Sequence, residues 1–277
     1  MKQLSEEDKK YKLTFERMVN FVRSIGLEVN TNTKARGHQG FFLKNRIDIS
    51  SNIDYKRKIE VLIHEFTHYV HYKIDPSVVK SHGSLAILFP DSDIDRVEAE
   101  LMRVTKFVDR NRALHTLYVQ RENTLDEIKK LSSEIKMEYP DFKRSSPYKP
   151  IEKEIKKTDA KYLLKYDRVK VKTMFLGATK DYSVQTIDTD FPKFDYCTKT
   201  YIVLKSKQRL LKRISGRINR LNSYYKRPTE LFARFVEALF VDTAKVSELA
   251  PHAYLVFCSE LSKNRYLHLA DLINNFF

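Results

Sequence analysis

The 277-residue chain contains little cysteine and no long apolar run. Its two cysteines, Cys197 and Cys258, allow at most one disulfide, and a reducing compartment is the default expectation. No C-x-x-C pair occurs, which excludes zinc sites built from cysteine clusters. No stretch approaches the roughly 20 apolar residues that a membrane-spanning helix needs. The charged residues 1–13 lack the apolar core of a secretion signal, so we expect a cytoplasmic protein without a membrane span.

Acidic residues are outnumbered by basic ones. The chain has 51 Lys and Arg residues against 36 Asp and Glu residues, a formal net charge of +15. Residues 198–227 alone contain ten Lys or Arg and no Asp or Glu. This pattern is typical either of a solvated basic helix face or of a surface that binds nucleic acid or another acidic partner. Both interpretations stay open at this point.

The distribution of apolar residues predicts a globular, mostly helical α+β protein. Hydrophobic residues make up 42% of the chain, as in folded rather than disordered proteins. Apolar side chains recur with helical spacing in residues 6–25, 55–74 and 228–242. Residues 27–50 are shorter extended pieces with polar, glycine-containing connections, which predict a small antiparallel or mixed sheet.

The helix pattern divides the chain into three parts. Residues 1–93 are expected to hold a helix, the small sheet and a second helix. Residues 94–222 are long, charged and helical, and we interpret them as a basic insertion. Residues 223–277 return to apolar helices and are expected to complete a site that begins in the first part.

The second predicted helix carries the motif H-E-x-x-H, which begins at His64. Residues i and i+4 lie one turn apart on the same face, so His64 and His68 can bind one Zn²⁺ at about 2.0–2.1 Å. Glu65 is rotated by about 100°, flanks the metal and can accept a proton from a water held there. His71 lies about 10 Å from His64 along the helix, so we expect it behind the ligands, at the rim or on the surface. The alternative is a buried histidine pair with a solvated Glu65.

A catalytic zinc takes three protein ligands and keeps one position for water, so a third ligand is needed. The motif H-E-x-x-H-x-x-G-x-x-H does not supply it, because His71 replaces the glycine and Ile74 the third histidine. Glu230 is the leading candidate, since an unpaired carboxylate entering a strongly apolar helix is unfavourable. Glu98 or Glu100, in a charged helix, is the second choice. Without a metal, Glu230 would be a carboxylate that favours its helix N-terminus.

The segments "IHEFTHYVH" and "YYKRPTELFARFVEALF" together resemble zincin metallopeptidases of the lethal-factor type. They also resemble the metallopeptidase-like domains of large polyvalent proteins from phages and mobile elements. The resemblance covers roughly residues 38–72 and 222–242. It implies a zincin-like core with Glu230 as the third zinc ligand. It also implies that Tyr224 or Tyr225 stabilises the oxyanion, whereas ordinary packing is the alternative for both.

These features predict a zinc-dependent metalloendopeptidase that acts on a protein or peptide substrate. Zn²⁺ is the expected cofactor, with Glu65 as the general base. The resemblance implies that an extended substrate pairs with an edge strand within Phe41–Ile49. The rival hypothesis is a nucleic-acid-associated phage or mobile-element protein, in which the zincin fold is a scaffold and residues 198–227 bind phosphates. A third is a structural protein whose zinc only supports folding.

Overall fold

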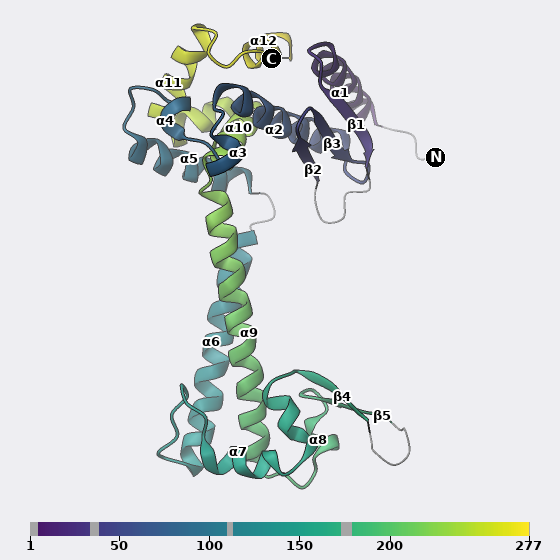
Figure 1. Ribbon diagram of the computed structural model, residues 1–277, viewed down its shortest axis with the longest axis vertical. Helices are drawn as coiled ribbons and strands as arrows, with labels where there is room; N and C mark the ends of the chain where they lie inside the picture. Colours follow the sequence, from purple (N-terminus) through teal and green to yellow (C-terminus); the bar gives the residue numbers. More distant parts are fainter. Residues whose placement is uncertain (1–4, 34–38, 110–112, 173–178, 277) are drawn as a thin grey trace. The chain divides into compact units, whose positions relative to one another are not determined.

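The computed structural model describes residues 5–33, 39–109, 113–172 and 179–276. The chain forms two compact units (Figure 1): the first combines Met1–Arg112 with Asn222–Phe277, and the second is Ala113–Leu221. Helices dominate both units and the sheets are small, which confirms the mostly helical α+β class. Within the described ranges, no helix combines the length and the apolar character needed to cross a bilayer.

The first unit is built around one central helix, α2. Its elements are α1 (Glu6–Ser24), β1 (Glu28–Thr33), β2 (Gly40–Leu43), β3 (Arg46–Ser50), α2 (Tyr55–Ile74), α3 (Val78–Ser81), α4 (Leu85–Leu88), α5 (Ile94–Val108), α10 (Pro228–Leu249), α11 (Pro251–Ser262) and α12 (Leu269–Phe276). Helix α2 contacts α1, strands β2 and β3, and α10, and α10 in turn contacts α5. Residues far apart in the sequence therefore meet on α2.

Helix α2 has clear start and stop signals. The side chain of Asp54 accepts a hydrogen bond from the backbone N–H of Arg57 at 2.7 Å and so caps the first turn. The helix ends at Ile74, directly before Asp75 and Pro76, because proline cannot continue a helical ladder. These local signals fix where the H-E-x-x-H residues lie along the helix.

The sheet of the first unit is mixed, with strand order β1-β3-β2. Strand β1 is parallel to β3, and β2 is antiparallel to it, with Phe41 opposite Asp48. Ile47 and Ile49 of β3 are fully buried. Strand β2 crosses close to α2 at Gly40, where a Cβ atom would collide with Val61 of the helix. The order leaves β2 at an edge of the sheet, next to the helix that carries the motif.

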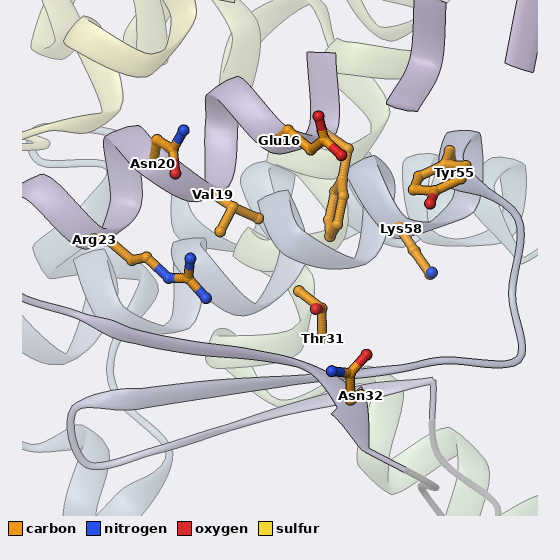
Figure 2. Close-up of a pocket in the computed structure, with 9 residues that line it drawn as sticks. Glu16, Val19, Asn20, Arg23, Thr31, Asn32, Tyr55 and Lys58 are labelled. Carbon is orange, nitrogen blue, oxygen red and sulfur yellow. The ribbon is translucent and has the colours of Figure 1, made fainter. Parts of the chain in front are cut away.

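An open cavity of about 410 Å³ lies between α1, β1 and the start of α2 (Figure 2). The charged ends of Arg23 and Lys58 lie on either side of Thr31 and Asn32 in that view. Arg23 is held in place by a 2.8 Å hydrogen bond from its Nη2 to the carbonyl of Val29. The residues that line this cavity include no histidine or cysteine, and it is separate from the candidate metal ligands.

The second unit has its own apolar core. Its elements are α6 (Ala113–Glu138), α7 (Lys149–Lys156), the 3-10 helix η1 (Asp159–Leu164), β4 (Arg168–Lys172), β5 (Thr179–Ser183), α8 (Ile187–Asp190) and most of α9 (Tyr196–Tyr225). Helices α6 and α9 run side by side (Figure 1) and pack through Leu117, Ile214 and Ile218. A larger cluster around the buried Phe142 and Tyr201 joins α7, η1 and α8 to them. Strands β4 and β5 form an antiparallel pair.

The second unit begins at Ala113, not at residue 94 as predicted. Helix α5 belongs to the first unit, because Val97, Leu101 and Val104 are fully buried in the core that contains α2 and α10. Its charged residues occupy the remaining faces, and this gave the helix the appearance of an insertion. The other end of the second unit is Leu221, one residue before the predicted end at residue 222.

Replacing Glu100 with alanine is expected to destabilise the first unit. Glu100 is buried on α5, and its Oε2 accepts a 2.8 Å hydrogen bond from the N–H of Ala253 in the first turn of α11. Glu100→Ala leaves this N–H without its partner, which lowers the free energy of unfolding by about 1–3 kcal/mol in urea titrations. Glu98→Ala is the matched control. Glu98 only approaches Lys226 at 3.9 Å on the surface, so a change of at most about 1 kcal/mol is expected.

Candidate metal centre

Three predicted metal ligands from two helices converge in the first unit. His64 and His68 lie one turn apart on α2, with ring centroids 4.8 Å apart, and Glu230 lies in the first turn of α10. Glu230 Oε2 is 3.6 Å from His64 Nε2, and Glu230 Oε1 is 3.4 Å from His68 Nε2. One donor atom from each residue lies within 4.8 Å of the other two. The structure thus joins the motif to a carboxylate far downstream in the sequence.

The donor set fits a zinc ion. Ligand atoms at about 2.0–2.1 Å from a tetrahedral ion lie about 3.3 Å from one another. The two imidazole-to-carboxylate distances, 3.6 and 3.4 Å, are close to this value. Glu230 Oε2 is also buried without a hydrogen-bond partner among the described residues, which is unusual for a carboxylate oxygen. Two imidazoles and one carboxylate are a common donor set for catalytic zinc.

A second carboxylate of α10, Glu237, orients His64. Glu237 Oε2 lies 3.0 Å from His64 Nδ1, so this nitrogen donates to the carboxylate and Nε2 is turned toward Glu230. Arg57 Nη1 donates to Glu237 Oε1 at 2.7 Å and holds the carboxylate from its other side. Glu237 is not among the site residues predicted from the sequence. The available signal was its spacing of seven residues from Glu230, which places both acids on one face of an apolar helix.

The charges of this cluster favour a bound cation. Burial acts to raise the pKa of Glu230 and of Glu237, but His64, helped by Arg57 at Glu237, outweighs it and both pKa values fall to about 2. Burial acts to lower the pKa of His64, yet the two carboxylates raise it to about 10. Burial and the charge of His64 lower the pKa of His68 to about 3. Two ionised carboxylates therefore lie next to the His64 imidazole. Either a proton on His64 or a bound metal ion can balance their negative charge.

Glu65 lies between the ligand cluster and strand β2. Its side chain is buried, and burial raises its pKa to about 7, although the charge of His64 opposes this shift. The side chain also lies against strand β2, because a Cβ atom at Gly40 would be only 3.3 Å from Glu65 Cγ. Glu65 is thus packed between the metal ligands and the edge strand of the sheet. A solvated Glu65, the alternative expected for an ordinary histidine pair, is not what the structure contains.

The two candidate tyrosines at the end of α9 have different surroundings. Tyr224 lies next to Glu230. Its hydroxyl helps to lower the pKa of the Glu230 carboxyl. In turn, burial and the charge of Glu230 raise the pKa of the Tyr224 phenol. Tyr225 is buried, and the guanidinium of Arg234 lies 4.6 Å from the centre of its ring. Burial raises the pKa of Tyr225 to about 12. Only Tyr224 presents its hydroxyl to the ligand carboxylate.

The remaining candidates lie outside the cluster. Glu100 is bound to the backbone of Ala253, and Glu98 approaches Lys226, so neither joins the histidines. His71 is fully buried, so of the three positions expected for it, behind the ligands, at the rim or on the surface, the last two are wrong. Its Nε2 is 3.6 Å from Asp75 Oδ2, and burial lowers its pKa to about 4.

Zinc content is expected to depend on Glu230 and not on Glu100. After loading with zinc and gel filtration, elemental analysis should give about one zinc per chain for the wild type and for Glu100→Ala. His64→Ala and Glu230→Ala should lose the metal, because each removes one of three ligands. Full zinc content in Glu230→Ala with loss in Glu100→Ala would contradict the proposed ligand set.

Glu237→Gln is expected to weaken zinc binding without abolishing it. The amide keeps the size of the side chain but removes the charge that holds His64 Nδ1, and loss of such partners typically reduces metal affinity about 10- to 100-fold. Competition with a chromophoric chelator measures this change. Glu248→Gln, at an exposed position of α10 beyond its kink at Asp242, is the control and should bind zinc as the wild type does. Equal affinity of Glu237→Gln and wild type would show that Glu237 does not position the ligand.

Comparisons with known proteins gave no match for this chain. No protein family, curated protein or solved structure matches it. The resemblance to zincins therefore rests on the two short segments and on the residues that they bring together. Functional inference starts from the chemistry of this cluster.

Proposed function

We propose that the first unit is a zinc-dependent peptidase of the zincin type. The observation that carries this proposal is the convergence of His64, His68 and Glu230 with the buried carboxylate of Glu65 beside them. A site that only held a structural ion would be expected to offer a fourth protein ligand, whereas three ligands leave a position for water or substrate. Within the described residues, the group contains three.

Each residue has a role that follows from its position. His64, His68 and Glu230 would hold Zn²⁺, which when bound acidifies a water and polarises a carbonyl oxygen. Glu65 takes a proton from the attacking water and delivers it to the leaving amine, since it is next to the ligands without being one of them. The hydroxyl of Tyr224 donates a hydrogen bond to the substrate oxygen that becomes negatively charged as the water attacks. Tyr225 has no part in this chemistry, because its ring packs against Arg234.

Strand β2 is the proposed binding edge for the substrate chain. It is an edge strand, so the outer side of its backbone is available for pairing with an extended peptide. The Glu65 side chain lies against this strand, where a Cβ atom at Gly40 would be 3.3 Å from its Cγ. A peptide aligned along β2 would therefore pass directly by the general base. This arrangement supports a protein or peptide as the proposed substrate.

We expect peptide cleavage to require Glu65, whereas zinc binding should not require it. Glu65→Gln should reduce hydrolysis of casein or of a mixed peptide library by about 10²–10⁴-fold, because the amide cannot accept the proton. Zinc content should stay at the wild-type level. Removal of zinc by a chelator should abolish cleavage, and zinc should restore it. Failure of the zinc-loaded wild type to cleave any peptide would leave the site as a metal-binding scaffold or a folding aid and would reject the peptidase proposal.

The two neighbouring tyrosines provide a matched pair for the oxyanion role. Tyr224→Phe should lower the turnover number by about 10²–10³-fold, because it removes one hydrogen-bond donor. Tyr225→Phe removes the same group from the adjacent position and should leave the turnover number within about threefold of the wild type. Steady-state kinetics on a fluorogenic peptide measure both. Equal losses in the two variants would contradict a specific role for Tyr224.

A further inference from the structure

The positive charge of the chain is concentrated in the second unit. Ala113–Leu221 contains 25 Lys or Arg and 14 Asp or Glu, a net charge of +11. The first unit contains the other 26 basic and 22 acidic residues, a net charge of +4. The excess therefore does not belong to the unit that holds the candidate metal centre. A separate binding role for the second unit explains this separation of charge.

Four arginines form a stripe along α9. Arg209, Arg213, Arg217 and Arg220 are spaced by four, four and three residues, which places them on one face of the helix over about 16 Å. The last three are exposed. Neither Arg217 nor Arg220 has a carboxylate partner among the described ion pairs, so their charges are available to a ligand. We call these four residues the arginine stripe.

Packing on a neighbouring face of α9, about 100° around the helix, keeps the stripe at the surface. Ile214 and Ile218 are buried against Leu117 of α6. These isoleucines also recur every four residues, so the apolar face and the arginine face run in parallel along the helix. The arginine stripe cannot turn inward without exposing this apolar contact.

One carboxylate ties the stripe to the neighbouring strand β4. Asp167 Oδ1 accepts from Arg209 Nη2 at 2.6 Å, and Asp167 Oδ2 accepts from Arg213 Nη2 at 2.9 Å. Arg209 Nη1 also donates to the carbonyl of Leu164 at 2.7 Å. Although burial opposes the shift, these arginines lower the pKa of Asp167 to about 2. The contacts place the segment before β4 directly beside the arginine stripe.

That segment adds one exposed aromatic ring and further cations. Tyr166, next to Asp167, is 57% exposed, and Lys165 is exposed beside it. Strand β4 then presents Arg168, Lys170 and Lys172 on its exposed face. Of these three, Arg168 and Lys170 share one carboxylate, Asp181 of β5. An exposed tyrosine thus lies in a short segment that contains exposed cations and whose neighbouring residues, Leu164 and Asp167, contact two arginines of α9.

We propose that the second unit binds single-stranded nucleic acid across the arginine stripe, Tyr166 and strand β4. A row of guanidinium groups about 6 Å apart suits the regularly spaced phosphates of a nucleic-acid backbone. A tyrosine between cations provides a stacking surface for a base, and only an unpaired strand can present its bases in this way. An acidic protein would use the cations but would have no need of the exposed ring. This surface and the metal centre belong to different units, so neither proposal depends on the other.

Fluorescence anisotropy with the full chain tests the proposal. The probes are fluorescently labelled oligothymidylate and oligouridylate of about 20 nucleotides and a labelled duplex of equal length. The protein is titrated into each probe at salt concentrations between about 50 and 200 mM, with a metal chelator in the buffer. Single strands should bind, with affinity that falls as salt rises. Arg217→Ala/Arg220→Ala should weaken binding about tenfold or more and reduce the salt slope by about 1.4, the value for two lost phosphate contacts. Tyr166→Ala should weaken single-strand binding about five- to 100-fold, with no loss for the duplex.

A charge-matched variant separates a specific surface from general attraction. Lys10→Ala/Lys106→Ala removes two exposed positive charges from the first unit and should change affinity by less than about twofold. Circular dichroism should show wild-type helix content in all variants, since each altered side chain is exposed. The proposal is overturned if this control loses as much affinity as Arg217→Ala/Arg220→Ala, or if no oligonucleotide binds at low salt. Tighter binding of the duplex, unaffected by Tyr166→Ala, would equally reject single-strand recognition.

Discussion

The first unit depends on the contact between one imidazole and two carboxylates. His64 has Glu237 3.0 Å from Nδ1 and Glu230 3.6 Å from Nε2, and both acids come from the same face of α10. Buried carboxylates are unfavourable unless they are paired, so this contact fixes α10 against α2 in both position and rotation. Arg57 completes the pairing of Glu237, whereas one oxygen of Glu230 stays without a hydrogen-bond partner. That oxygen is where a metal ion would complete the arrangement.

The other faces of the two helices make the contact rigid. Leu62, Phe66 and Val70 of α2 and Phe232 and Phe235 of α10 are fully buried in one core. Sites built on packed helices hold their side chains more accurately than sites on loops. Strand β2 approaches the same helix at Gly40 and packs against Glu65, the general-base candidate. Ligands, base and proposed binding edge are therefore held by the same packing.

The inserted unit leaves this arrangement intact, because every residue of the candidate metal centre belongs to the first unit. The chain leaves the first unit after α5 and returns to it at the end of α9. The insertion has its own buried core and most of the excess positive charge. The chain thus separates two proposed binding surfaces of different chemistry. One is a buried anionic cluster suited to a metal ion, and the other is an exposed cationic stripe suited to phosphates.

The sequence by itself determined the features that depend on neighbours in the chain. Three such features are local: the helical spacing of apolar residues, Pro76 just past the end of α2, and the four-residue separation of His64 from His68. The structure contains each of them. Tertiary packing decided the rest. His64 and Glu237 are 173 residues apart, and no local pattern specifies such a contact. Packing also places α5 in the first unit, because its apolar face is buried in that core. The many charged residues on its other faces had favoured an insertion in the sequence-based prediction. Packing chose between adjacent tyrosines as well, since helix rotation alone sets which hydroxyl reaches Glu230.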